Sequence, residues 1–133
     1  MGSSVFPGNV PPVDPESRDV SLTIPAKPGY LVLARLALSA VCRLTPLEPA
    51  EVADLKLAVT EAASEFVNES ADDDTTVDFQ FRLHDDRLVL ELSGPPNSEP
   101  LDEQELSRAI IEATVDRADF TAGRTLLTKQ LEP

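Results

Sequence analysis

Apolar and polar residues follow regular periods over most of the chain after residue 18. Apolar side chains alternate with polar ones over 20–24 and stop at Pro25, which predicts a short strand with one buried face. The next stretch, 28–44, is apolar almost all the way round a helical wheel. It predicts a helix that is either deeply buried or presents a second apolar face to a partner.

Further along, the pattern changes from a helical period to a strand period. Apolar residues recur every three or four positions over 52–66, which predicts an amphipathic helix from Pro49 to about Asn68. Segments 77–83 and 88–92 then alternate apolar and polar residues on either side of a polar turn. They predict an antiparallel hairpin with one face buried.

The last third of the chain predicts one more helix and further strands. The helix is expected from Leu101 to about Ala118, and a strand is expected to begin near Phe120. Residues 125–131 are β-prone and follow a turn at Gly123. The order strand, helix, helix, hairpin, helix, strands favours an α+β fold with the helices on one face of a sheet.

The length of 133 residues suits one domain. Residues 1–18 are rich in proline and small polar residues and offer little surface to bury, so we expect a disordered tail there and the domain at 19–133. The start of the chain lacks the basic and apolar regions of a secretory signal. The most apolar stretch, 30–42, is too short to span a bilayer, and both features favour a cytoplasmic protein that does not bind membranes.

The charge balance is strongly negative, with 24 Asp and Glu against 11 Lys and Arg, a net charge of −13. Such a chain repels nucleic acid and anionic membranes and favours a partner with a basic surface, as DNA-binding proteins have. The alternative is that the acidic surface only aids solubility. Cys42 and His84 are the sole residues of their types, so neither a zinc site nor a histidine-based nucleophile is expected, unless His84 serves alone.

Three segments of the first half carry a resemblance to a known family. They read Leu-Thr-Ile-Pro-Ala-Lys-Pro at 22–28, Ala-Arg-Leu at 34–36 and Val-Ala-Asp-Leu-Lys-Leu-Ala-Val-Thr-Glu-Ala at 52–62. The chain resembles the anti-sigma-factor kinases of the RsbW and SpoIIAB type, small members of the GHKL histidine-kinase-like ATPase superfamily. The similarity extends over about 19–131 and is weak after residue 93. It implies a two-layer α/β sandwich, with three helices on one face of a mixed, mostly antiparallel sheet.

The resemblance also implies a site for ATP and Mg²⁺, and the sequence departs from the family at three motifs there. The family has a Glu for the reacting group and, four residues later, an Asn for Mg²⁺; Glu61 matches the first, but Glu65 stands at the Asn position. The Asp-x-Gly motif is replaced by a stretch with Ser93 at or near the Asp position, followed by Gly94. The glycine-rich turn before the last helix is absent and Glu103 lies there instead, and the flexible lid is missing.

These departures predict a degenerate nucleotide pocket at Glu61, Glu65, Ser93 and Gly94, in which Glu61 is a vestigial catalytic residue. ATP and Mg²⁺ are therefore not expected as cofactors, although a carboxylate is a suitable Mg²⁺ ligand. Spacing alone fits a second interpretation, in which Glu61 and Glu65 belong to a solvated acidic helix face.

The resemblance assigns partner binding to the first helix. Arg35 matches an Arg at the surface where a sigma factor and an anti-anti-sigma factor compete, and Leu31, Leu38 and Ser39 are expected to share that surface. Arginine is a preferred anchor of protein interfaces. The alternative is an Arg35 side chain that covers its own helix.

The function that follows is that of an anti-sigma factor, which sequesters a sigma factor and is released by a STAS-type anti-anti-sigma factor. One alternative is an active serine kinase that phosphorylates that antagonist. The other is a non-catalytic interaction domain with an unrelated partner. Because an apolar first helix is a liability when exposed, we also expect a homodimer or a complex with the partner.

Overall fold

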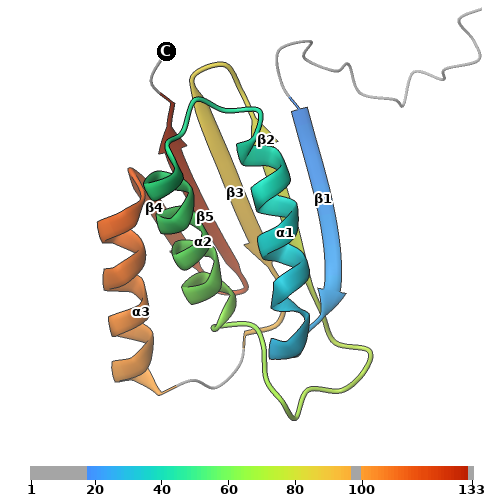
Figure 1. Cartoon of the computed structure of the whole chain (residues 1–133). Helices are drawn as coiled ribbons and strands as arrows, with labels where there is room; N and C mark the ends of the chain where they lie inside the picture. The colour runs from blue at the N-terminus through green and yellow to red at the C-terminus, as the bar shows by residue number, and fades with distance from the viewer. Residues whose placement is uncertain (1–17, 97–99, 132–133) are drawn as a thin grey trace, which may run out of the picture.

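The computed structural model describes residues 18–96 and 100–131, in which helices cover one face of a five-stranded sheet (Figure 1). The strands are β1 (Arg18–Pro25), β2 (Thr76–Leu83), β3 (Arg87–Ser93), β4 (Arg117–Thr121) and β5 (Arg124–Gln130). The helices are the short 3₁₀ helix η2 (Pro28–Tyr30), α1 (Leu31–Cys42), α2 (Pro49–Ala63) and α3 (Leu101–Thr114). The predicted tail at 1–18 lies outside the described residues, apart from Arg18 at the start of β1.

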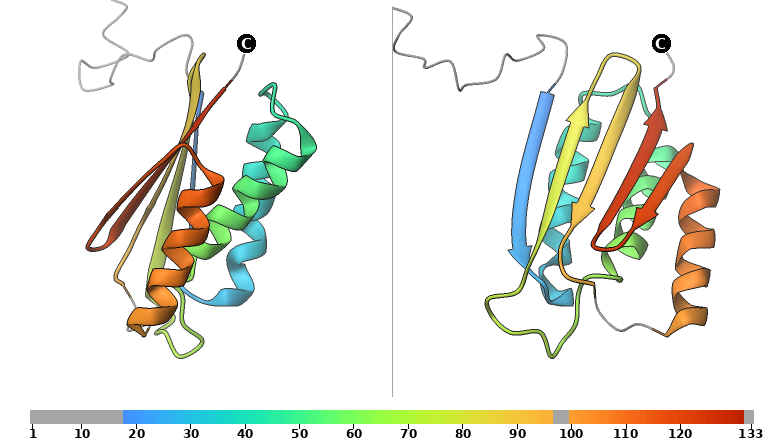
Figure 2. Two further views of the ribbon diagram at one scale, coloured as in Figure 1. Left: turned by 90° about the vertical axis from the view of Figure 1, so that its left-hand side faces the viewer. Right: turned by 180° about the vertical axis from the view of Figure 1, so that it is seen from behind.

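The strands lie in the order β1-β2-β3-β5-β4, and every neighbouring pair is antiparallel. Figure 2 shows the sheet edge-on, with all three α-helices on the same side. The predicted α+β sandwich with helices on one face is therefore confirmed. The sheet differs from the expected mixed one because the hairpins β2-β3 and β4-β5 and the two remaining pairings are all antiparallel.

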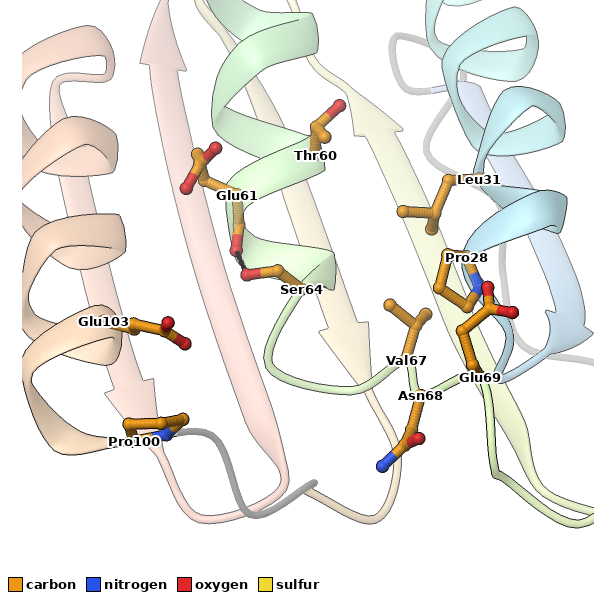
Figure 3. A pocket seen from close by; sticks show the side chains of 10 residues that line it. All are labelled: Pro28, Leu31, Thr60, Glu61, Ser64, Val67, Asn68, Glu69, Pro100 and Glu103. Atoms are coloured by element: carbon orange, nitrogen blue, oxygen red, sulfur yellow. Dashed lines mark hydrogen bonds between the residues drawn. The ribbon is translucent and has the colours of Figure 1, made fainter.

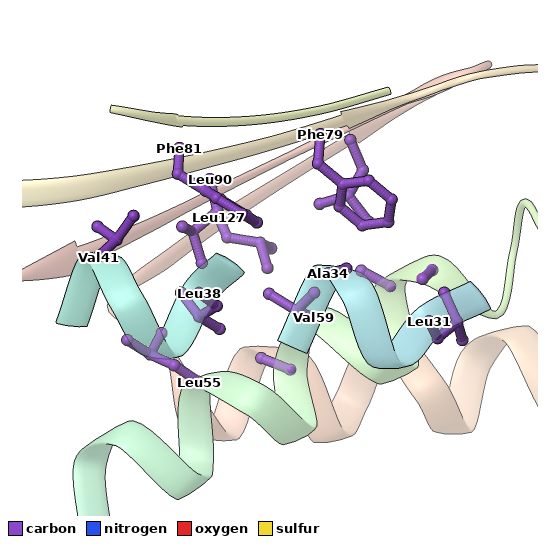
Figure 4. Packing of buried hydrophobic residues seen from close by; sticks show 14 of the residues in the cluster. Leu31, Ala34, Leu38, Val41, Leu55, Val59, Phe79, Phe81, Leu90 and Leu127 are labelled. Atoms are coloured by element: carbon purple, nitrogen blue, oxygen red, sulfur yellow. The ribbon is translucent and has the colours of Figure 1, made fainter. Parts of the chain in front are cut away.

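The core lies between the sheet and the helices because each inner strand turns alternate residues towards the helical layer. Phe79 and Phe81 project from β2 and are fully buried, with ring centroids 6.2 Å apart. They face apolar side chains of α1 and α2, including Leu38 and Val59 (Figure 4). Leu90 of the neighbouring strand β3 is also fully buried.

Two helices end earlier than their sequence patterns predict. The backbone leaves α2 after Ala63, and the N–H of Asn68 donates to the carbonyl of Ala26 at 2.8 Å, so residues that seemed helical join a loop. Helix α3 ends at Thr114 rather than near Ala118, because Val115 takes extended angles and the following residues pair with β5. In both cases tertiary hydrogen bonds override a local helical period.

Helices α2 and α3 lie side by side, whereas α1 lies over β1 and β2 (Figures 1 and 2). The N-terminus of α2 is stabilised because Glu48 and Glu51 form a reciprocal capping box and Pro49 occupies the first helical position. The α2 residues that carried the family resemblance are thereby presented between the other two helices. Among the described residues, no helix is long and apolar enough to cross a membrane.

Candidate functional site

Glu61 lies in the last turn of α2 and Glu65 in the turn that follows the helix, and the side chains of both contact α3. The carboxylate of Glu61 accepts a hydrogen bond from the Ser107 hydroxyl, with 2.9 Å between Oε1 and Oγ. Ser107 is itself buried between the helices. The prediction that both lie on one helical face is therefore met only in part, because Glu65 lies beyond the end of α2, and α3 rather than solvent covers both carboxylates.

Glu65 is a buried carboxylate with a charged partner. Its two oxygens accept hydrogen bonds from Arg108, at 3.0 Å from Nη2 and 3.2 Å from Nε. The side chain of Glu65 is only 7% exposed, so this carboxylate is withdrawn from water, whereas the Arg108 side chain is 35% exposed. The guanidinium carbon of Arg108 also lies 4.5 Å from the centre of the Phe120 ring, in a cation–π contact.

A hollow of about 480 Å³ lies where the end of α2 faces the starts of α1 and α3 (Figure 3). Its described lining contains the three carboxylates of Glu61, Glu69 and Glu103 and no Lys or Arg. Figure 3 shows Glu103 on α3, across the hollow from Glu69. The hollow is thus an acidic site, which suits cationic groups and opposes phosphates.

Ser93 and Gly94 do not join the two glutamates. Strand alternation places Ser93 on the same face as Glu91, whose carboxylate binds Arg82 and Arg124 on the side away from the helices. Gly94 lies where the backbones crowd, since a Cβ there would be 3.0 Å from the carbonyl oxygen of Thr76. The close approach of the Thr76 carbonyl therefore explains why a residue without a side chain stands at this position.

The residues predicted on the first helix divide into two groups. Leu38 is fully buried and Leu31 nearly so, and their placement on a binding surface was wrong because both face the core. Arg35 and Ser39 are half-buried at the side of α1 that faces α2, and Arg35 donates from Nη1 to the Thr60 hydroxyl at 3.3 Å.

The exposed apolar residues of α1 are Val32, Leu33 and Leu36, which periodicity did not single out. Their spacing of three and four puts Leu36 next to both others on the outer side of the helix. Beside them a groove of about 600 Å³ runs between α1 and α2 and contains Arg43 and Lys56. We call Val32, Leu33, Leu36 and Arg35 with this groove the α1 surface.

Comparison with known proteins places the chain in a family. The model of the Histidine kinase-like ATPase domain matches residues 24–128, most of the chain. The chain belongs to this family. Its relatives place it in the RsbW and SpoIIAB-type group.

Three relatives illustrate the match. The chain is 32% identical over 76 residues to the serine-protein kinase RsbW of Listeria monocytogenes serotype 4a, covering 56% of this chain and 48% of the relative. It is 25% identical over 104 residues to the serine-protein kinase RsbW of Halalkalibacterium halodurans, covering 78% of this chain and 64% of the relative. The crystal structure of the RsbU and RsbW domains of a Mycobacterium tuberculosis protein superposes with a TM-score of 0.67 at 18% identity. The match covers 87% of this chain and 33% of that one, and it supports the fold.

The RsbW-type chain spans about half the length of the first of these relatives. Its similarity therefore identifies the domain and its family, while the activity and partners of the whole protein are a separate question.

The residues of this RsbW-type domain fit Mg-ATP poorly. Glu65 replaces the Asn expected for Mg²⁺, and its carboxylate is already bound by Arg108. The adjoining hollow presents carboxylates to any phosphate, and Glu103 lies in the first turn of α3, where a phosphate would need free N–H groups. Within 18–96 and 100–131, no group of three His, Cys, Asp or Glu residues is arranged to hold a metal ion.

Sequence analysis missed Arg108 and the outer residues of α1. Arg108 is 43 residues from Glu65, and no local motif signals such a pair. The outer residues of α1 had a detectable signal, since an apolar helix without acidic residues must leave some apolar side chains exposed.

Proposed function

We propose that this domain is an anti-sigma factor that sequesters a sigma factor without nucleotide, through the α1 surface. The supporting observation is the composition of that surface: α1 exposes Val32, Leu33 and Leu36 and contains Arg35 but no acidic residue. In a chain of net charge −13, this is a local apolar and basic patch. A sequestered segment with apolar side chains and flanking carboxylates would complement it.

The family supports the class of partner. RsbW-type proteins act in partner-switching systems, so a sigma factor and a STAS-type anti-anti-sigma factor are the partners we propose for this chain. The two would compete for the α1 surface, and release would follow from binding of the antagonist rather than from a phosphorylation by this domain. The poor fit of the glutamate site to Mg-ATP supports the nucleotide-independent form of this proposal.

The test is affinity capture from a lysate of the host organism, with and without Mg-ATP, followed by mass spectrometry. A retained sigma factor, in equal amount under both conditions, is the expected result. Arg35→Glu should abolish that retention, because it reverses the charge at the α1 surface. The matched control is Arg117→Glu, which changes an exposed arginine on β4, away from α1.

Thermal unfolding of both variants separates loss of binding from loss of folding. Failure to retain any sigma factor, or unchanged retention by a folded Arg35→Glu variant, would contradict the proposal. In that case an interaction domain with an unrelated partner becomes the favoured non-catalytic function.

The relatives named serine-protein kinases favour a second candidate, a serine kinase acting on the antagonist. Glu61 lines the hollow beside α2, as a residue serving a reacting group would. Measurable Mg-ATP binding and phosphate transfer to the antagonist, both lost in Glu61→Ala, would establish this function. The three carboxylates of the hollow favour the opposite result.

A further inference from the structure

Helix α3 has fewer buried side chains than α1 or α2. Only Ser107 and Ile111 of its described residues are buried, while Leu101 and Leu106 are largely exposed. Apolar burial therefore contributes less to holding α3 in place than it does for the other two helices. The polar contacts of α3 therefore contribute a larger part of the energy that holds this helix in place.

Those contacts form one connected group. Ser107 donates to Glu61, and the next residue, Arg108, binds both oxygens of Glu65. On its other side, the Arg108 guanidinium lies over Phe120 of β4. One side chain thus links the turn after α2 to α3 and β4, in the fork geometry that lysine lacks.

The charges around this group make the guanidinium essential. Glu65 follows Glu61 by four residues, in the turn after α2, and Asp102 and Glu103 lie in the first turn of α3. Without Arg108, a buried carboxylate would be left uncompensated beside other acids, and α3 would be repelled from α2.

The sequence positions of the two glutamates suggest what the Arg108 contact replaces. In the family that the chain resembles, the position of Glu61 carries the Glu for the reacting group and the position of Glu65 the Asn for Mg²⁺, both beside the bound ATP. We propose that Arg108 is a built-in cation that replaces this ligand and holds α3 closed on α2 at all times. The proposal rests on the nucleotide-independent function above and gives its structural cause: the domain keeps one conformation whatever the nucleotide supply.

Hydrogen–deuterium exchange of the free, full-length chain, followed by mass spectrometry, tests this directly. In Arg108→Ala, amides of α3 (101–114) should exchange about tenfold faster or more, since breaking a buried ion pair is strongly destabilising. Amides of β1, β2 and β3 should keep their wild-type rates. Arg117→Ala is the matched control, because its ion pair with Asp119 is exposed and should leave α3 unaffected.

A double-mutant comparison identifies the partner. Glu65→Ala should also accelerate exchange in α3, and Glu65→Ala/Arg108→Ala should be no faster than Arg108→Ala alone, because both changes remove one link. If Arg108→Ala does not fold, Arg108→Lys takes its place, and intermediate protection of α3 is expected because the charge remains while the fork is lost.

Two results would overturn the proposal. One is wild-type exchange in α3 of Arg108→Ala or, where that variant does not fold, of Arg108→Lys. The other is slower exchange of wild-type α3 on addition of Mg-ATP, which would show that a ligand is still needed to close the helix. The exchange experiment contains no partner protein, so a negative result in it does not bear on sigma-factor binding. Conversely, a failure to capture a sigma factor does not bear on the role of Arg108.

Discussion

Arg35 donates a hydrogen bond to Thr60, which fixes the one basic side chain of α1 against the side of α2. Thr60 in turn donates to the carbonyl of Lys56 at 2.8 Å, so its hydroxyl is oriented to accept from the guanidinium. The charge of Arg35 is thereby held beside the exposed Leu36 rather than free to move over its own helix. A partner that binds α1 meets an apolar patch with a cation in a fixed place.

The first prediction concerns Leu36, which we expect to be an apolar anchor for the sigma factor. Leu36→Glu should weaken binding about 30-fold, because a buried interface anchor contributes about 2 kcal/mol. Leu106→Glu is the control, since Leu106 is 64% exposed on α3 and Leu36 is 62% exposed on α1. Titration of the captured sigma factor by calorimetry measures both; equal affinities would remove α1 from the interface.

The apolar helix α1 shows how far sequence reasoning reaches. Its existence was predicted because residues 28–44 are apolar almost all the way round a helical wheel. The orientation of the helix could not be predicted, because apolar residues surround it and the sequence pattern does not distinguish a buried face from an exposed one. The sequence therefore predicted Leu38 on the binding surface and did not single out Leu36. The packing of α1 on β1 and β2 shows that Leu38 is buried and Leu36 is exposed.

The second prediction concerns Gly94, whose missing side chain lets β3 approach the Thr76 carbonyl. Gly94→Ala should lower the free energy of unfolding by about 1–3 kcal/mol, because the added Cβ would lie 3.0 Å from that oxygen and force a backbone shift. Gly29→Ala is the control, since no heavy atom lies within 4 Å of its Cβ position, and it should change stability by less than about 1 kcal/mol. Urea denaturation gives both values, and equal losses would refute the packing explanation.

The third prediction concerns the pH dependence of stability through Glu91. Arg124 is the main cause that lowers the pKa of this carboxyl below its ordinary value of 4.5, and Arg82 adds to it. A lowered pKa in the folded state stabilises the fold above pH 4.5, and this contribution is lost as the pH falls through the folded pKa. Glu91→Gln should therefore reduce the thermal midpoint at pH 7, and the difference from the wild type should shrink as the pH falls below 4.5.

A matched substitution on α3 gives the reference for that experiment. Glu112→Gln removes the same charge from an exposed position and should leave the pH profile close to that of the wild type. A Glu91→Gln profile parallel to the wild type at all pH values would show that the pairing with Arg124 does not stabilise the fold.

The glutamate site could be predicted only in part. The spacing of Glu61 and Glu65 and the family resemblance predicted both on one helical face; both contact α3, but Glu65 lies in the turn after α2. Their partners came from α3, and no periodicity or motif connects Arg108 to α2. Ser93 was grouped with them by motif position, whereas the alternation of β3 turns it to the opposite face. Side-chain direction at a strand end depends on register, which the motif does not encode.

The last prediction concerns Cys42, the single thiol, which lies in the groove of the α1 surface and is 5% exposed. Burial is the main cause that raises the pKa of this thiol above its ordinary value of 9.0, and Lys56 opposes it. The neutral thiol is therefore favoured in the fold, so its contribution to stability is complete below pH 9 and is lost as the pH rises through the folded pKa. The fall in stability between pH 8 and about pH 10 should be smaller in Cys42→Ala than in the wild type. Native alkylation by iodoacetamide should also be slow and accelerate in denaturant, whereas rapid alkylation of the folded chain would show that the groove is open to solvent at Cys42.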